Sequence, residues 1–246
     1  AACALLATIL FQFPGTIVSA NPLPPRCPVS LTNPDGQALI LEKYDLRVAV
    51  HGPISLVEME MVFRNPEKRQ MEGRFTYLLP PGATISRFAK EVDGRLMEGE
   101  VVEKLHAQSI YTEILHTMRD PALLETDQGN RFSARVFPIP AEGTVRLLLS
   151  YSQRLPLRNA ERKLSVPLHG LPKIREFSAS LYVLLQQAED VSNTSFYGPI
   201  EPFSIAPDGK RFYNLSRKAA DFTAERDFEV TLKSDGNAPK VSALKA

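Results

Sequence analysis

Apolar residues recur at every second position in several short stretches, and this period is the feature that most constrains the fold of this chain. The clearest stretch carries Val57, Met59 and Met61 with Glu58 and Glu60 between them. Successive side chains of a β-strand point to opposite faces of a sheet, so such a stretch buries one face and exposes the other. The same period returns in residues 46–50, 132–136, 145–151, 177–185 and 228–232. The sequence therefore predicts a mainly β protein.

Proline and glycine separate these stretches at short intervals. With 20 prolines and 13 glycines, the chain places pairs such as Asn65-Pro66, Pro81-Gly82 and Asp208-Gly209 beside the apolar stretches. Proline fixes one backbone angle and glycine accepts conformations closed to other residues, so such pairs favour turns. Many short strands joined by turns are typical of a β-sandwich-like arrangement of antiparallel sheets.

One segment has a different period. In residues 101–118, apolar residues lie three and four positions apart, which is the spacing of one helix face. Asp120-Pro121 ends the segment, because a residue before proline avoids the helical region. We expect one amphipathic helix to pack on the sheets through Ala107, Ile110, Tyr111, Ile114, Leu115 and Met118.

The beginning of the chain is typical of a secretory signal. Residues 1–20 carry no charge, and an apolar run at 4–11 is followed by small residues that end at Ala20. The basic start of such a signal is missing, and the run is too short for a spanning helix, which needs roughly 20 apolar residues. We expect cleavage after Ala20 and a secreted or cell-envelope protein, extracellular or periplasmic. Proline-rich residues 21–38 are expected to form a linker, and 236–246 a polar tail.

The charge balance argues against several partners. Lys plus Arg is 29 and Asp plus Glu is 28, and clusters such as 64–69 mix both signs. A nucleic-acid-binding protein usually gathers basic residues on one face. We therefore expect no nucleic-acid partner, and no membrane insertion beyond the signal.

Two patterns resemble metal sites but lack the required geometry. Asp190-Val191-Ser192 resembles the start of an Asp-x-Ser-x-Ser metal motif, yet Pro199 and its neighbours do not suit the helix that should follow. We expect a polar turn there. Glu103/His106 and Glu113/His116 are Glu-x-x-His pairs on one predicted helix, roughly 15 Å apart. Because such pairs need facing helices to share ions, both histidines are expected to be solvated, and we predict no metal site.

Catalysis has no support in the sequence. There is no Gly-x-Ser-x-Gly motif, and no phosphate-binding glycine loop. Cys27 lies in the expected linker without a neighbouring base, so we interpret it as a passive thiol. Tyr111 and Tyr151 are interpreted as core residues. We therefore expect no enzyme activity, no catalytic residues and no cofactor.

An ordered series of motifs spans residues 39–156. They are Val-Phe-Arg-Asn at 62–65, Phe-Thr-Tyr-Leu-Leu-Pro-Pro-Gly-Ala at 75–83, Gly-Glu-Val-Val-Glu-Lys at 99–104, Asp-Pro-Ala-Leu-Leu-Glu at 120–125 and Val-Phe-Pro-Ile-Pro at 136–140. This series resembles the VIT domain, the vault protein and inter-alpha-trypsin inhibitor heavy-chain module. The motif at 120–125 is similar to that of bacterial secreted members.

The resemblance implies a non-catalytic module. In such proteins a von Willebrand factor A-type domain usually follows, and residues 157–235 resemble the β connector between the two. We expect an A-type domain to follow Ala246 and to cover connector strands that lack partners here. The implied function is a protein-interaction or scaffold unit next to an adhesive A-type domain. The alternative is a polysaccharide-binding β-sandwich at the cell surface, against which the absence of Trp counts.

Overall fold

The computed structural model describes residues 27–98, 130–186, 189–195 and 204–234. These residues form strands and turns, and none of them is helical. The helix expected at 101–118 lies outside the described residues. The strands are β1 (Val29–Thr32), β2 (Ile40–His51), β3 (Ile54–Arg64), β4 (Met71–Leu79), β5 (Ala83–Val92), β6 (Arg95–Glu98), β7 (Asn130–Ile139), β8 (Thr144–Arg154), β9 (Glu161–Val166), β10 (Ile174–Leu184), β11 (Glu189–Thr194), β12 (Ser204–Ile205), β13 (Arg211–Phe222) and β14 (Phe228–Ser234).

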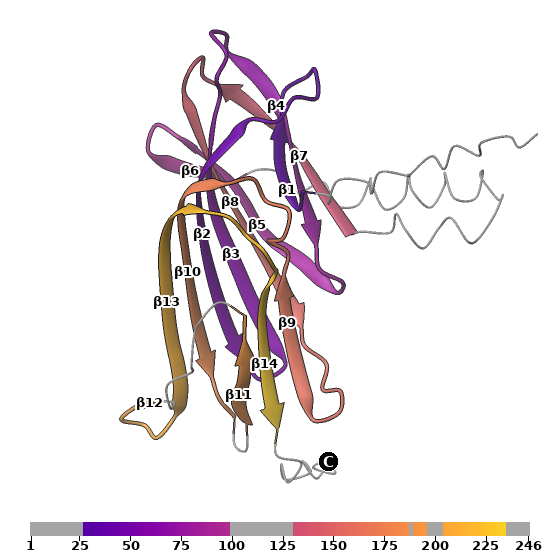
Figure 1. Ribbon diagram of the computed structural model, residues 1–246, viewed down its shortest axis with the longest axis vertical. Helices are drawn as coiled ribbons and strands as arrows, with labels where there is room; N and C mark the ends of the chain where they lie inside the picture. The colour runs from indigo at the N-terminus through magenta and orange to yellow at the C-terminus, as the bar shows by residue number, and fades with distance from the viewer. Residues whose placement is uncertain (1–26, 99–129, 187–188, 196–203, 235–246) are drawn as a thin grey trace, which may run out of the picture.

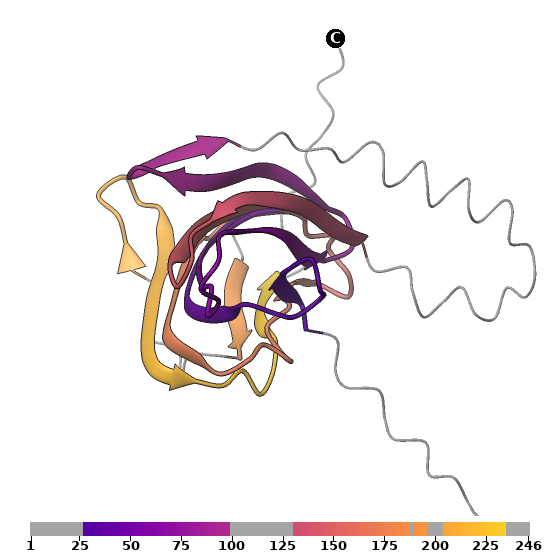
Figure 2. The same ribbon diagram turned by 90° about the horizontal axis from the view of Figure 1, so that it is seen from above.

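One long sheet organises the molecule. Its eight strands follow the order β12-β13-β10-β2-β3-β8-β5-β6. All neighbours are antiparallel except β10 and β2, which are parallel. Two smaller sheets, β1-β4-β7 and β11-β14-β9, have three strands each. They lie at opposite ends of the long sheet, which curls around them (Figures 1 and 2).

The alternation in the sequence decides which face of the long sheet is covered. Val57, Met59, Met61 and Phe63 all point to the face that the small sheets cover, and all are buried. Leu56, on the opposite face of the same strand, is exposed. Each such buried side chain stabilises the fold by roughly 1.5–3 kcal/mol. The prediction of a mainly β, sandwich-like fold is confirmed.

Aromatic side chains fill the core along the length of the long sheet. At the end covered by β1-β4-β7, Phe75 packs against Phe63, Phe88 and Phe132, with ring centroids 5.4–6.3 Å apart. Towards β10 and β13, Phe177 stacks on Phe222 at 4.0 Å. The buried apolar residues form one cluster rather than two.

Two segments differ from their expected roles. The expected linker contains β1, because Val29 and Leu31 alternate and are buried in the core. The expected connector does not lack partners: β10 pairs with β2 along nine residues from Glu176 to Leu184. Residues before and after position 156 therefore share one sheet and one core. Sequence periodicity reveals strands but not which distant strands pair.

Candidate functional site

The face of the long sheet that neither small sheet of the described residues covers carries two kinds of surface. The register places the outward residues in rows across the strands, perpendicular to them. Near the turn between β2 and β3, one row contains Leu56, Ala49, Tyr182 and Asn214, and the next contains Ile54, His51, Leu184 and Phe212. The six apolar residues of these two rows are called the apolar band.

Four of the six residues of the apolar band are exposed, and Leu184 and Phe212 are half-buried. Leu56 is 55% exposed, Ile54 46% and Tyr182 42%. The ring of Tyr182 lies beside that of Phe212, with centroids 5.7 Å apart. Large exposed apolar groups that adjoin one another mark interaction surfaces more often than scattered ones do.

A hollow of about 580 Å³ lies along the inner margin of the apolar band. Small outward residues, Ala49, Ser150 and Ser180, line it between the longer side chains of Arg47 and Tyr182. Because these residues are short, a side chain from a partner fits where a longer residue would otherwise stand. Because Glu58 and Arg87 line it as well, the hollow has an apolar margin, a polar floor and a charged side.

Beyond the hollow, the same face is charged and internally paired. Glu60 is only 5% exposed although it points outward. Its carboxylate lies 2.7 Å from the guanidinium of Arg146, 3.5 Å from that of Arg47 and 3.8 Å from the ammonium of Lys43. Hydrogen bonds to Glu60 and Glu91 raise the pKa of Arg146 further above its ordinary range. Since these charged groups already have partners, this half of the face has fewer groups available to bind a ligand.

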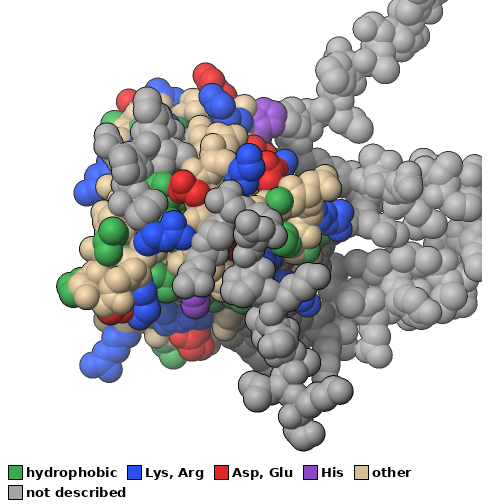
Figure 3. Space-filling view, turned by 90° about the horizontal axis from the view of Figure 1, so that it is seen from below, with side chains coloured by type: hydrophobic (Ala, Val, Ile, Leu, Met, Phe, Trp, Pro, Cys, Tyr) green, Lys and Arg blue, Asp and Glu red, His purple; other side chains and the backbone are tan. Residues whose placement is uncertain are grey.

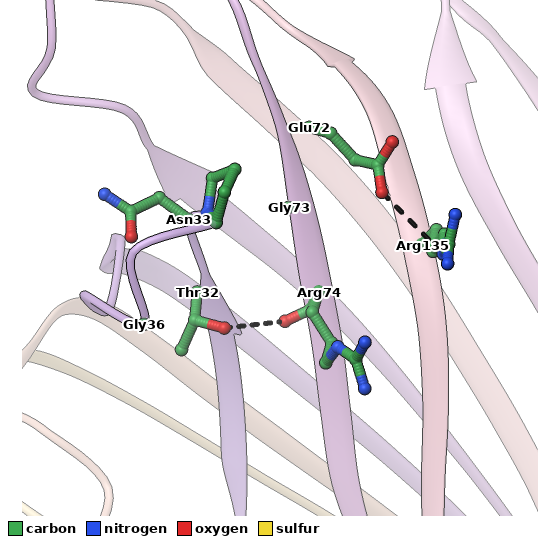
Figure 4. A pocket seen from close by; sticks show the side chains of 8 residues that line it. Thr32, Asn33, Gly36, Glu72, Gly73, Arg74 and Arg135 are labelled. Carbon is green, nitrogen blue, oxygen red and sulfur yellow. Dashed lines mark hydrogen bonds and ion pairs between the residues drawn. The ribbon is translucent and has the colours of Figure 1, made fainter.

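The second hollow, of about 400 Å³, lies on the outward face of the sheet β1-β4-β7. Figure 4 shows Glu72 and Arg135 directed towards one another, with the side chain of Arg74 directed away from Thr32. The Glu72–Arg135 ion pair measures 3.7 Å. Arg74 and Arg135 are direct cross-strand partners, so two like charges adjoin on this surface.

The residues from the Asp-x-Ser pattern lie on a strand and not in a turn. Asp190 and Ser192 belong to β11. The hydroxyl of Tyr213 donates to Asp190 at 2.6 Å, and Ser192 donates to the Thr231 carbonyl at 3.3 Å. Burial, followed by the Asp190 hydrogen bond, raises the pKa of Tyr213 to about 12. The expected polar turn is wrong, because Val191 packs into the core and holds the segment extended.

Within the described residues, no three His, Cys, Asp or Glu side chains are grouped so that they could hold a metal ion. The pairs Glu103/His106 and Glu113/His116, and Tyr111, lie outside the described residues. The prediction that no metal or cofactor binds therefore stays a prediction.

The remaining candidate residues are dispersed. The Cys27 thiol donates to the Val29 carbonyl at 2.8 Å, and burial raises its pKa. A raised pKa makes a thiol a poorer nucleophile at neutral pH. His51 and His169 are exposed and belong to different parts of the molecule. Tyr151 is fully buried, as expected.

The end of the molecule that holds the turn between β2 and β3 has a mixed surface. Figure 3, which looks onto this end, shows Lys and Arg side chains interspersed with Asp and Glu, and hydrophobic side chains in small groups only. The apolar band on the flank of the sheet is therefore the more distinctive surface. Among the described residues, no helix is long and apolar enough to span a membrane.

A known family matches the part of the chain that forms most of the long sheet. Residues 41–151 match the family described as the vault protein inter-alpha-trypsin domain. These residues are a VIT domain. The match includes β2, β3 and β8, whereas β10 and β13, which complete the apolar band, come after it. The VIT resemblance seen in the sequence is confirmed.

Curated relatives carry an A-type domain in their names. The chain is 28% identical over 119 residues to von Willebrand factor A domain-containing protein 5A of Mus musculus, and 25% identical over 119 residues to that of Homo sapiens. Each match covers 48% of this chain and 15% of the relative. The chain thus spans a small part of these relatives.

Solved structures give weaker likenesses. A Legionella pneumophila protein described as nutrient-binding is 10% identical, with a TM-score of 0.47 over 83% of this chain and 69% of that chain. An M1 zinc metallopeptidase of Deinococcus radiodurans is 12% identical, with a TM-score of 0.40 over 83% and 42%. Both scores are below 0.5, so neither likeness bears on the function of the VIT domain.

Sequence reasoning did not identify the apolar band. A signal was present in β3, where Ile54 and Leu56 occupy outward positions although Val57 and Met59 already provide the buried face. Apolar residues on both faces of a strand predict a second contact surface. The contribution of Tyr182 required the pairing of β10 with β2, which no local pattern predicts.

Proposed function

We propose that this chain is a secreted, non-catalytic VIT module that binds an A-type domain of the same protein and supports it. The observation that carries the proposal is the apolar band, an exposed apolar surface on a face whose other half consists of paired charges. A partner that covers Leu56, Ile54 and Tyr182 gains roughly 25 cal/mol for each Å² of apolar surface removed from water. The curated relatives, named for their A domains, indicate which partner to test first.

The position of the band supports an intramolecular partner. β14 ends at Ser234, at the same end of the long sheet as the turn between β2 and β3 (Figure 1). A domain tethered after β14 therefore starts at the same end of the long sheet as the band, and reaches the band by passing around this end from the covered face. A short tether keeps the local concentration of such a partner high without requiring tight intrinsic affinity.

Secretion and the non-catalytic role rest on different observations. The uncharged, apolar residues 1–20 support export. For the non-catalytic role, the support is that the described histidines and Cys27 are dispersed and that the hollow beside the band, where the charged residues Arg47 and Glu58 are already paired with one another, is lined by no histidine or cysteine.

Hydrogen exchange tests the proposal. This chain is compared with the longer protein that carries its A-type domain, each purified from the same host. We expect slower exchange in the longer protein for amides at the β2–β3 turn and the end of β10, whereas β6, far from the band, exchanges equally in both. Equal exchange at the band, or protection spread evenly over all strands, contradicts the proposed contact.

A second candidate is a cell-surface polysaccharide. The adjoining rings of Tyr182 and Phe212, with Ser180 and Asn214 beside them, favour it, because sugar rings stack on aromatic side chains while hydroxyls bond to polar ones. Screening the chain against immobilised glycans discriminates the two. Saturable binding lost in Tyr182→Ala supports the sugar, and its absence together with protection by the A-type domain supports the protein partner.

A further inference from the structure

β7 has one edge without a neighbour among the described strands. Its sheet has the order β1-β4-β7, and β7 pairs only with β4. The pairing runs from Asn130 to Ile139, with a register shift near the far end. An open edge presents unpaired N–H and C=O groups, which bind an extended chain by adding a strand to the sheet.

The side chains of β7 that face outward have a distinct chemistry. Arg131 and Arg135 are exposed, Ser133 lies between them, and Phe137 follows with 61% of its surface exposed. Strand geometry places Arg131 and Arg135 about 13 Å apart on the same face. An extended chain beside β7 therefore passes two cations and then an aromatic ring at a fixed spacing.

These cations are less neutralised than those of the long sheet. Within the described residues, Arg135 contacts the carboxylate of Glu72 at 3.7 Å, whereas Arg131 and Arg74 have no ion pair. On the outward face of the long sheet, Arg47 and Arg146 each contact two or more carboxylates. The outward face of β4 and β7 thus carries three arginines and one carboxylate, which favours an anionic partner.

A second copy of this chain does not suit the edge. If two β7 strands paired antiparallel about Ser133, Arg131 of each copy would face Arg135 of the other. Parallel in-register pairing would place each arginine beside its own equivalent. Like charges directly opposite one another destabilise a strand pair, so the edge disfavours self-association while an acidic strand remains compatible.

We propose that the free edge of β7 binds an extended acidic segment of another protein, which adds a strand to the sheet β1-β4-β7. Its acidic side chains lie opposite Arg131 and Arg135, four residues apart, and an apolar side chain lies opposite Phe137. Main-chain hydrogen bonds provide much of the affinity, and the arginines set the register. This surface differs from the apolar band, so the proposal stands independently of the A-type partner.

A pair of synthetic peptides provides the probe. The first is an extended, threonine- and valine-rich peptide with two glutamates four residues apart and a leucine two residues beyond one of them. The second has the same composition with the glutamates three residues apart, which places them on opposite faces of a strand. Binding to the complete chain is followed by fluorescence anisotropy at low ionic strength, where exposed charges are least screened.

Charge reversal tests the role of the edge. Two exposed ion pairs are lost and two like-charge contacts are gained in the double variant Arg131→Glu/Arg135→Glu, so the first peptide should bind it at least about fourfold more weakly. The control Arg95→Glu/Arg158→Glu changes the net charge equally at exposed sites elsewhere and should bind within about twofold of the original chain. Equal melting temperatures show that all three proteins are folded.

The proposal predicts three results together: preference for the first peptide, loss in the β7 variant alone, and slower hydrogen exchange in β7 when the peptide is bound. Equal binding of both peptides, equal loss in the control variant, or absence of binding overturns it. Polygalacturonate, an anionic polysaccharide that cannot add a strand, provides the remaining comparison. If it binds as tightly as the first peptide and is equally sensitive to the β7 variant, the site is a general anion surface and the strand proposal is wrong.

Discussion

Ala49 of β2 and Tyr182 of β10 are neighbours in the parallel pair of strands that joins the two halves of the chain. Ala49 lies inside the VIT match, and Tyr182 lies beyond it. Their side chains share one row of the apolar band, so neither half forms this surface alone. The VIT domain and the strands that follow it therefore act as one structural unit.

Replacing Phe177 tests this unity. Phe177 is buried in β10 and packs against Tyr44 of β2, with ring centroids 6.3 Å apart, and against Phe222. We expect Phe177→Ala to lower the free energy of unfolding by about 3–5 kcal/mol. Because both halves share one core, denaturant unfolding monitored by hydrogen exchange should show a single transition that includes β3 as well as β10. Loss of protection in β10 with β3 unchanged contradicts a single unit.

Much of the strand structure could be predicted from the sequence. Alternation at 57–63, 145–151 and 177–185 identified β3, β8 and β10, because one side of each strand is covered by core and the other is not. Asp208-Gly209 was correctly predicted as a hairpin turn, here between β12 and β13.

The parts that could not be predicted depend on contacts between distant residues. β1 has only four residues, which is too short for alternation to be distinguished from chance, and its burial depends on β4. No pattern in the local sequence of either strand predicts the parallel pairing of β2 with β10. The burial of Glu60 arises from Arg146 and Lys43, which lie in different strands. The candidate surface was therefore missed even where its strands were recognised.

The pH dependence of stability should reflect three buried tyrosines. Tyr77 and Tyr151 have ring centroids 6.0 Å apart, and their hydroxyls and that of Tyr44 are buried. Burial raises the pKa of all three above the ordinary value of 10. The phenols of the unfolded chain ionise at a lower pH than those of the folded chain. The free energy of unfolding is therefore unaffected below about pH 10, and it falls as the pH rises from there towards the pKa values of the folded state.

Alkaline unfolding measures this effect. Each buried tyrosine should contribute a loss that approaches about 1.4 kcal/mol per pH unit above about pH 10. We expect Tyr151→Phe to reduce this slope in urea unfolding measured at several alkaline pH values, whereas Tyr182→Phe, at an exposed position, leaves it unchanged. Equal slopes in the original chain and in Tyr151→Phe would show that these hydroxyls are not held in their neutral form.

The like-charged pair of Arg74 and Arg135 predicts a gain in stability on substitution. They are direct cross-strand partners on an exposed face. Arg74→Glu replaces repulsion by attraction, and we expect the free energy of unfolding to rise by about 0.2–1 kcal/mol at low ionic strength. The gain should shrink at high salt, because exposed charges are screened. A loss of stability that does not depend on salt would show that Arg74 has a structural role in the sheet.

Binding of the proposed partner, a separately produced A-type domain, to this chain tests the central claim most directly. Leu56→Asp places a carboxylate within the apolar band, and Met97→Asp is the matched control, since Met97 of β6 is 59% exposed and Leu56 55%. Isothermal titration calorimetry should show at least about tenfold weaker binding for Leu56→Asp, equivalent to 1.4 kcal/mol, and unchanged binding for Met97→Asp, with equal melting temperatures for both variants. If Leu56→Asp binds the A-type domain as well as the original chain does, the apolar band is not the docking surface.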